Sequence, residues 1–301
     1  MKLRYGLVVR TASYWNLYVG QAKGFFAKEG LDVAEVLTTS TLGGVEMLRR
    51  REVDIAANAP DMVIEADLAG AGLCLIGGLV NRQKSGLVAR PACRNFADLR
   101  GGRVALGPAH SGTAILIEEV LRRRGLERGS YRPVDVGSTS IRLAAALEGD
   151  GVDAVLLTQP YDFLLLERGY HRLAVVDEVV PDYPFACLAA RREPGPEERA
   201  AQVAFLRASA AAGAWLRDPA NAAEATGILA GASGLEPRLA ERTYALYFDA
   251  RPALARGVEI EPEGIEQVLS LLAQAGRVPD PPPAADRFID TSLMDEALSQ
   301  A

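Results

Sequence analysis

The sequence predicts an α/β protein with two similar lobes, and two observations carry this prediction. The segment 38–54, TTSTLGGVEMLRRREVD, aligns without gaps with the segment 137–153, GSTSIRLAAALEGDGVD. In both segments a hydroxyl-rich loop precedes an amphipathic helix, and Val-Asp then leads into a short apolar strand. Apolar runs of strand length that alternate with helical periodicity are typical of parallel β-α-β units. We therefore expect each copy to form the core of one lobe.

The elements expected around the repeat follow the same order in both copies. An opening strand is expected at 3–9 and again at 102–108, and the strand that feeds the loop at 31–37 and again at 131–137. The strand after the repeated helix is expected at 55–60 and at 154–160, each closing on proline. Each copy therefore reads strand, loop, helix, strand, loop, helix, strand.

Two lobes require the chain to cross between them, and two strand-like segments are placed to do so. SGLVAR (85–90) leads out, and PFACLAA (184–190) leads back before a Pro/Gly break. The long helix expected in EERAAQVAFLRASAAAGAWLRD and the later helices return to the first lobe. We therefore expect a first lobe of residues 1–88 and 191–301 and a second of residues 89–190. Because open α/β sheets bind ligands at the carboxyl ends of their strands, the expected site is a cleft between lobes joined by two hinge strands.

The composition limits the classes of protein to which the chain can belong. With 49% apolar and 24% charged residues, the chain of 301 residues is expected to be globular. Its longest apolar run, at 73–80, is too short to span a membrane. A net charge of −6 without a long basic stripe argues against a nucleic-acid partner. Three cysteines and two histidines at unrelated spacings predict no metal site, and no motif indicates a cofactor.

The first candidate group for ligand binding follows the opening strand and consists of Ser13, Tyr14, Trp15 and Asn16. Two large aromatic side chains in a loop would be exposed to water unless a ligand or a neighbouring helix covers them. We expect Trp15 or Tyr14 to face the cleft. The alternative is that both aromatic rings pack under a helix.

Hydroxyl and amide side chains form the second candidate group. Thr39, Ser40 and Thr41 precede the first copy of the repeated helix, where capping accounts for one of the three. Asn58 and Gln159 lie at the ends of matching strands, shortly before prolines. We expect the hydroxyls that do not cap the helix, and the two amides, to face the ligand.

The third candidate group is the start of the helix in GPAHSGTAILIEEVLRRRGL, residues 107–126, and comprises His110, Ser111, Gly112 and Thr113. The first amides of a helix have no partner within the helix and attract negative charge. We expect these amides and hydroxyls to bind an anionic group, with Gly112 allowing close approach. The alternative is a helix that Ser111 or Thr113 simply caps.

Several stretches resemble the substrate-binding proteins of ABC importers for sulfonates, nitrate, taurine and pyrimidine precursors. They are GFFAKEGLDV (24–33), NFADLRGGRVALGPAHSGT (95–113), GVDAVLLTQPYDFLLLERGY (151–170) and RFIDTSLMDEAL (287–298). The resemblance implies a type II periplasmic-binding-protein fold that closes its lobes on a small anionic or aromatic ligand. It also implies an ABC permease and ATPase as partners, and a monomer or weak dimer is expected. A mature chain would be periplasmic; no signal peptide is visible in MKLRYGLVV, so a chain that is native as given would be cytoplasmic.

Enzymes that share this fold provide the alternative function, namely a cytoplasmic decarboxylase of a hydroxylated aromatic acid or a desulfinase-like enzyme. A sulfinate desulfinase of this kind needs a nucleophilic cysteine in the first-lobe loop, and TASYWN (11–16) contains none. A thiamine-pyrimidine synthase needs a Cys-rich segment, and the sequence has none. The sequence therefore favours a binding protein over an enzyme.

Overall fold

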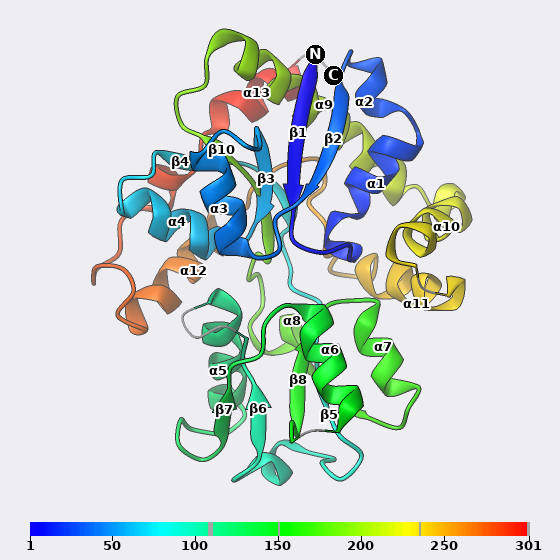
Figure 1. The fold of residues 1–301 in the computed structure, drawn as a ribbon, viewed down its shortest axis with the longest axis vertical. Helices are drawn as coiled ribbons and strands as arrows, with labels where there is room; N and C mark the ends of the chain where they lie inside the picture. The colour runs from blue at the N-terminus through cyan, green and yellow to red at the C-terminus, as the bar shows by residue number, and fades with distance from the viewer. Residues whose placement is uncertain (108–110, 150, 235, 300–301) are drawn as a thin grey trace. The chain divides into compact units, whose positions relative to one another are not determined.

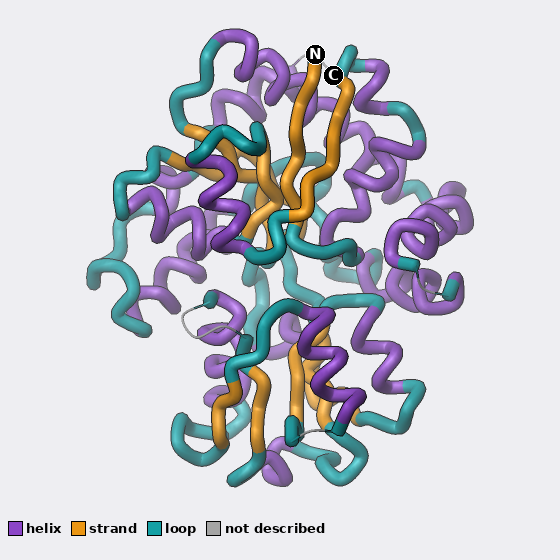
Figure 2. Tube along the Cα trace, viewed as in Figure 1, coloured by secondary structure: helices purple, strands orange, loops and turns teal. Residues whose placement is uncertain are grey.

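A computed structural model describes residues 1–107, 111–149, 151–234 and 236–299 of the chain. The chain forms two compact units, which are Met1–Arg82 with Pro184–Ala301, and Gln83–Tyr183. Each unit contains a five-stranded sheet with helices packed around it (Figures 1 and 2). The predicted two-lobed α/β fold is therefore confirmed. Within the residues given above, no helix combines the length and the apolar character that a membrane span requires.

The sheet of the first unit has the strand order β2-β1-β3-β10-β4. Its strands are β1 (Lys2–Leu7), β2 (Asp32–Leu37), β3 (Ile55–Asn58), β4 (Leu73–Val80) and β10 (Ala186–Arg191). The three strands β3, β10 and β4 are buried along their whole length, whereas the edge strand β2 has no buried residue. The strands expected at 3–9, 31–37 and 55–60 are β1, β2 and β3.

Nine described helices belong to the first unit, and the short 3-10 segments η1 (Ala12–Tyr14), η3 (Pro219–Asn221) and η4 (Ala285–Phe288) connect them. The helices are α1 (Trp15–Ala22), α2 (Phe25–Lys28), α3 (Thr41–Arg49), α4 (Pro60–Leu68), α9 (Pro196–Arg217), α10 (Ala222–Ser233), α11 (Pro237–Tyr247), α12 (Pro262–Gln274) and α13 (Thr291–Ser299). Helices α3 and α4 pack beside β3 and β4, while α1, α2 and α13 pack along α9. The long helix α9 begins at a proline followed by two glutamates and ends on an arginine, as the helix dipole favours.

The sheet of the second unit has the equivalent order β7-β6-β8-β5-β9. Its strands are β5 (Gly86–Ala89), β6 (Arg103–Ala105), β7 (Arg132–Val134), β8 (Ala154–Leu157) and β9 (His171–Val175). The helices are α5 (Gly112–Arg123), α6 (Thr139–Glu148), α7 (Tyr161–Leu166) and α8 (Val176–Val179), with a 3-10 turn, η2 (Phe96–Leu99). The core of this unit includes Val88, Val155 and Leu157, from the two central strands.

Neither sheet is wholly parallel, which corrects the expectation of parallel strands. Strand β10 runs antiparallel to β3 and β4, and β5 runs antiparallel to β8 and β9. Parallel neighbours need a crossover connection, usually a helix, that returns the chain to the same end of the sheet. The segments that enter β5 and β10 from the other unit have no such helix, so each strand enters from the carboxyl edge of its neighbour.

The boundaries expected after residues 88 and 190 fall within strands of the structure. Residues 83–88 belong to the second unit because β5 pairs with β8 and β9. Residues 184–190 belong to the first unit because β10 pairs with β3 and β4. The apolar character of both segments predicts a strand but does not specify which sheet accepts it.

The sequence repeat corresponds to a structural repeat at the level of single hydrogen bonds. The Val-Asp aspartate of the first copy, Asp54, accepts a hydrogen bond from the backbone N–H of Arg4 at 2.8 Å. Asp153, 99 residues later, accepts the same bond from the backbone N–H of Arg103 at 2.6 Å. Both aspartates therefore fix the opening strand of their copy of the repeat, β1 or β6, to the strand that follows the repeated helix.

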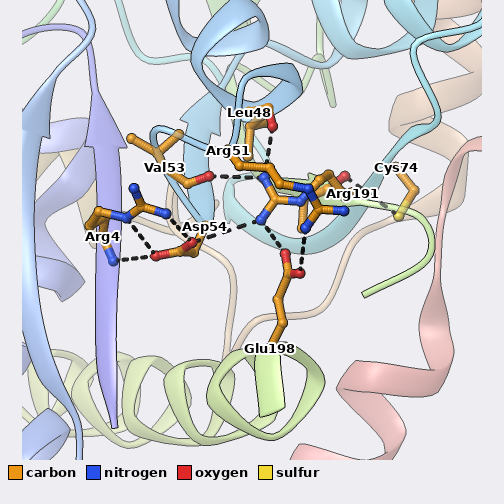
Figure 3. A network of polar contacts seen from close by, with 9 residues as sticks. Arg4, Leu48, Arg51, Val53, Asp54, Cys74, Arg191 and Glu198 are labelled. Atoms are coloured by element: carbon orange, nitrogen blue, oxygen red, sulfur yellow. Dashed lines mark hydrogen bonds and ion pairs between the residues drawn. The ribbon is translucent and has the colours of Figure 1, made fainter. Parts of the chain in front are cut away.

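An arginine at the end of the antiparallel central strand reaches the same aspartate in each unit. Arg191 at the end of β10 lies 3.8 Å from Asp54, and Arg90, directly after β5, lies 2.6 Å from Asp153. Figure 3 shows that in the first unit this contact belongs to a network that includes Glu198 of α9. Burial opposes the charged form of Asp54, but the hydrogen bonds from Arg4 lower the pKa of this carboxyl below its usual range.

Candidate ligand-binding site

The loop after β1 brings buried polar atoms to the carboxyl edge of the first sheet. Ser13 is fully buried and Asn16 nearly so. Among the described residues, the Ser13 hydroxyl and the Asn16 side-chain oxygen have no hydrogen-bond partner. A buried polar atom without a partner carries a free-energy penalty, and such atoms are uncommon unless they serve a function. Ser13 and Asn16 are therefore the members of the first candidate group that remain suited to contact a ligand.

Tyr14 and Trp15, by contrast, belong to the core of the first unit. The Trp15 side chain is fully buried, and its indole N–H donates to the carbonyl of Ala225 at 3.0 Å. The indole also packs edge-on against Tyr244 and Phe248 of the C-terminal helical region. Tyr14 is buried as well. The alternative, in which the ring packs under a helix, therefore describes Trp15, because the C-terminal helices cover its indole.

The hydroxyls before α3 serve mainly to organise the loop. The Ser40 hydroxyl accepts from the backbone N–H of Gly43 at 2.9 Å and caps the helix. The Thr39 hydroxyl donates to the carbonyl of Thr38 at 2.6 Å, and Thr39 has a φ of 62°, a left-handed conformation that is strained for a β-branched residue. Strain of this kind is concentrated at functional loops.

Asn58 connects the end of β3 to the start of α3. Its side-chain N–H donates to the carbonyl of Thr41 at 2.9 Å, and its side-chain oxygen accepts from the backbone N–H of Ala59 at 2.9 Å. A Cβ atom at Gly44 would lie 2.9 Å from the Asn58 side-chain nitrogen, so a larger residue there would displace this amide. Asn58 is therefore a neutral bridge between two loops of the carboxyl edge.

In the second unit, the start of α5 is capped as the simpler interpretation predicts. The Ser111 hydroxyl accepts from the backbone N–H of Ala114 at 3.2 Å, and Gly112 and Thr113 are the first two residues of the helix. His110 lies outside the described residues. Ser111 is therefore the N-cap of α5.

Gln159 is held in place by its own unit. Its side-chain N–H groups donate to the carbonyl of Lys84 at 2.6 Å and to the carboxylate of Asp162 at 3.1 Å. The Gln159 side-chain oxygen has no partner among the described residues. Burial raises the pKa of Asp162, while Arg172, 2.7 Å from that carboxylate, acts in the opposite direction. Gln159 therefore belongs to a buried polar cluster rather than standing alone at a strand end.

None of the three candidate groups includes Arg142 of α6, a charged residue near the carboxyl edge of the second sheet. Its guanidinium donates to the carbonyls of Leu156 at 2.9 Å and Gly137 at 2.5 Å, and to the hydroxyl of Thr139 at 3.3 Å. Arg142 is 6% exposed, and among the described residues no ion pair joins it to a carboxylate. Burial lowers its pKa to about 10, so the group is still charged at neutral pH.

Three segments of the second unit converge on this guanidinium. A Cβ atom at Gly107, in the loop after β6, would lie 3.2 Å from the Arg142 Nη1 and 3.5 Å from the Ser111 hydroxyl oxygen. Gly107 also has a φ of 88°, which favours glycine. We call the residues Gly107, Ser111, Gly112, Thr139 and Arg142 the Arg142 edge. It combines a buried positive charge with the N-terminus of a helix, and both attract anions.

The sequence repeat contains a signal that would have identified Arg142. At the gap-free offset of 99 residues, Arg142 takes the place of Gly43, and Leu157 takes the place of Asn58. A charged side chain thus replaces a glycine in the first turn of an otherwise apolar helix face. The two copies bridge the same two loops, one with a neutral amide from the strand and the other with a guanidinium from the helix.

The described thiols are poor candidates for covalent chemistry. Burial raises the pKa of the Cys74 and Cys187 thiols to about 12, so both are protonated at neutral pH. Cys93 is also buried. In the part of the chain that the structure describes, no group of three or more His, Cys, Asp or Glu residues is arranged to hold a metal ion.

Solved structures resemble this chain along nearly its whole length. The alkanesulfonate-binding protein SsuA from Xanthomonas axonopodis pv. citri, bound to MOPS, is 21% identical with a TM-score of 0.78, over 97% of this chain and 98% of that one. The nitrate-binding protein NrtA from Synechocystis PCC 6803 is 15% identical with a TM-score of 0.80, over 99% and 88%. The desulfurization enzyme DszB is 16% identical with a TM-score of 0.71, over 99% of each chain.

These likenesses identify the fold as that of the two-lobed periplasmic binding proteins. The model of the NMT1/THI5-like family matches residues 11–222, and the chain belongs to this family. No curated protein sequence matches the chain.

Proposed function

We propose that this chain is the solute-binding component of an ABC importer and that its ligand is a small organic anion held at the Arg142 edge. The observation that carries the proposal is the buried guanidinium of Arg142, which has no carboxylate partner among the described residues. A charge buried without a counter-charge is costly, whereas a bound anion would offset that cost. The buried charge of Arg142, unpaired among the described residues, therefore favours an anionic ligand over a neutral one.

The donors of Arg142 define the chemistry that would fit. A guanidinium has five N–H groups, and the three hydrogen bonds described above use one on each nitrogen. One N–H on each terminal nitrogen then remains for a ligand, which suits the two oxygens of a sulfonate, carboxylate or nitrate. The similar proteins whose names specify alkanesulfonate and nitrate support this class of ligand.

The first unit would contact the remainder of the ligand. Its candidate polar atoms, on Ser13 and Asn16, are neutral and lack partners among the described residues. Neutral hydroxyl and amide groups select by shape and hydrogen bonding rather than by charge. In this proposal the two units close on the ligand, and the closed form delivers it to a permease and its ATPase.

A binding screen followed by matched variants tests the proposal. Thermal shift with methanesulfonate, MOPS, taurine, nitrate, benzoate and a neutral pyrimidine should identify an anion that stabilises the protein, by about 2.7 kcal/mol at 100 times its Kd. Titration calorimetry of that anion should show a loss of ten- to hundredfold in Arg142→Gln, because hydrogen bonds to charged groups contribute about 1.5–3 kcal/mol each. Arg142→Lys keeps the charge but not the fork and should recover part of the affinity.

The control is Arg128→Gln, which removes an exposed arginine of the same unit. Arg128 pairs with Glu118 at 3.4 Å and its side chain is 82% exposed, so its loss should leave ligand affinity unchanged. Circular dichroism would verify that each variant is folded. Unaltered anion affinity in folded Arg142→Gln, or stabilisation by neutral compounds alone, would contradict the proposal.

A further inference from the structure

A pocket within the first unit is separate from the Arg142 edge, which belongs to the second unit. Its volume is about 480 Å³, within the range of about 300–1,000 Å³ that small-molecule sites occupy. Residues of β1, the edge strand β2, α1, α2, α9 and α10 line it. Because every lining residue lies in the first unit, the pocket is a property of that unit alone.

Aromatic rings form a continuous wall of this pocket. Tyr5 stacks on Phe205 with ring centroids 5.4 Å apart, and Phe205 stacks on Phe26 with centroids 4.9 Å apart. All three side chains are at most 3% exposed, so their positions are fixed by packing. The three rings therefore form a rigid apolar wall, against which an apolar ligand packs without ordering flexible groups.

Helix α10 leaves space open on its side of the pocket. Gly227 and Gly231 lie one turn apart and both line the pocket. A Cβ atom at either position would meet nothing within 4 Å. Glycine in a helix interior destabilises the helix by about 0.5–1 kcal/mol relative to alanine. Two glycines on one helix face therefore keep the pocket open at the expense of helix stability.

The wall also contains a buried polar atom of Tyr5. The Tyr5 hydroxyl is buried, and among the described residues it makes no hydrogen bond. Burial raises the pKa of Tyr5 well above its usual value, and the nearby carboxylate of Glu35 acts in the same direction. The hydroxyl is therefore neutral at physiological pH and can donate or accept one hydrogen bond.

The charges in the lining compensate each other. They belong to Arg10 and Glu35, whose side chains form an ion pair at 2.7 Å. An anion would face the carboxylate of Glu35, and a cation the guanidinium of Arg10. The pocket therefore favours a ligand without net charge.

From these observations we infer a second ligand site in this protein, which takes a neutral, largely apolar ring compound with one polar group paired to the Tyr5 hydroxyl. The aromatic wall provides a rigid apolar surface, the two glycines provide room, and the Arg10–Glu35 pair disfavours charged compounds. This site does not depend on the proposed anion site, and the two sites can each hold their own ligand at the same time.

Fluorescent probes that differ by one charge test the inference. N-phenyl-1-naphthylamine is neutral and carries one N–H group, and its fluorescence should rise on binding with a stoichiometry of one. The Gly231→Leu variant places a side chain in the open space and should weaken binding at least tenfold without lowering the melting temperature. Ala223→Leu, at an exposed residue of the same helix that does not line the pocket, is the matched control and should bind normally.

Two comparisons test the polar contact and the preference for a neutral ligand. Tyr5→Phe should weaken N-phenyl-1-naphthylamine about three- to tenfold, as expected for one hydrogen bond, and should leave the hydrocarbon 1-phenylnaphthalene unaffected. The sulfonated analogue 8-anilino-1-naphthalenesulfonate should bind this pocket at least tenfold more weakly than the neutral probe does. Its binding to the pocket is measured as the part of its fluorescence signal that Gly231→Leu removes.

Three outcomes would overturn the inference. The first is that the neutral probe shows no saturable binding. The second is that the wild type and Gly231→Leu bind the probe equally well. The third is that the wild type binds no probe and forms a dimer that Gly231→Leu disrupts. The last outcome would assign the pocket to contact with a second copy. Loss of anion binding in Arg142→Gln without any change in the neutral probe would keep this site independent of the proposed transport function.

Discussion

Replacing Arg191 by methionine should destabilise the first unit by several kcal/mol. Its guanidinium donates to the carbonyls of Leu48 at 2.7 Å and Val53 at 3.0 Å, and it forms an ion pair with Glu198 (Figure 3). The side chain is 10% exposed, and that of Glu198 is 15% exposed. Methionine fills much of the volume but leaves two buried carbonyls and one partly buried carboxylate without this donor.

The size of this loss in the free energy of unfolding follows from the groups that lose their hydrogen-bond or ion-pair partner. Breaking a buried ion pair from one side costs about 3–5 kcal/mol, and each unsatisfied buried carbonyl about 1–3 kcal/mol. Because Arg51 also contacts Glu198, and because water can reach part of the site, we expect a total of about 3–5 kcal/mol. Urea unfolding followed by circular dichroism would measure it as a lower midpoint with an unchanged slope.

Arg51 provides the control, because it pairs with the same carboxylate from the surface. Its contact with Glu198 is 3.3 Å long and its side chain is 64% exposed, so Arg51→Met should cost at most about 1 kcal/mol. A loss below about 1 kcal/mol in Arg191→Met, or equal losses in the two variants, would refute the assignment of burial as the cause.

Three further predictions concern other parts of the molecule. Trp15→Ala should lower the free energy of unfolding by about 3–5 kcal/mol while leaving anion affinity nearly unchanged; intact stability with lost affinity would restore the stacking role. Burial raises the pKa of Glu65 to about 7, against the opposing charge of Arg277, so the folded state binds an extra proton between about pH 4.5 and 7. Stability from this group is therefore present at low pH and lost as pH rises through 7, by up to roughly 3 kcal/mol, and Glu65→Gln should flatten urea midpoints over that range. Small-angle scattering should show a smaller radius of gyration when the anion is bound, and an unchanged radius at saturation would contradict closure of the units on the ligand.

The repeat made the fold predictable, because each copy carries a complete set of local signals. The apolar runs that became β1, β3 and β8, and the caps and periodicity of α3, are encoded within a few residues of one another. The sheet that accepts β5 or β10 is decided by long-range pairing, which leaves no mark in a local pattern. For that reason the strands were predicted, while the sheets that accept β5 and β10 and the antiparallel direction of these two strands were not.

The candidate site was less predictable, because the same side chain serves packing in one context and binding in another. Trp15 follows a strand as a ligand-binding aromatic residue would, yet residues from Ala225 to Phe248 enclose it. Nothing near residue 15 in the sequence indicates that these helices return to cover it. Arg142 shows the opposite case. Its position on an apolar helix face is visible in the sequence, but the lack of an ion pair to a carboxylate among the described residues is a property of the fold.

The two copies of the repeat connect equivalent segments of the carboxyl edge with different side chains. In the first unit, Gly43 and Gly44 place no side chains at the start of α3, and the neutral amide of Asn58 donates to the carbonyl of Thr41. In the second unit the strand ends on Leu157, which cannot make that bridge, and the helix supplies Arg142 instead. Both solutions satisfy the backbone carbonyls at the carboxyl edge, so the fold places no requirement on which is used. Only the second solution adds a charge, and a guanidinium is more than the bridge needs, because a neutral amide serves the same purpose in the first unit. The proposed anionic ligand would account for this additional charge, which the bridge between the loops does not require.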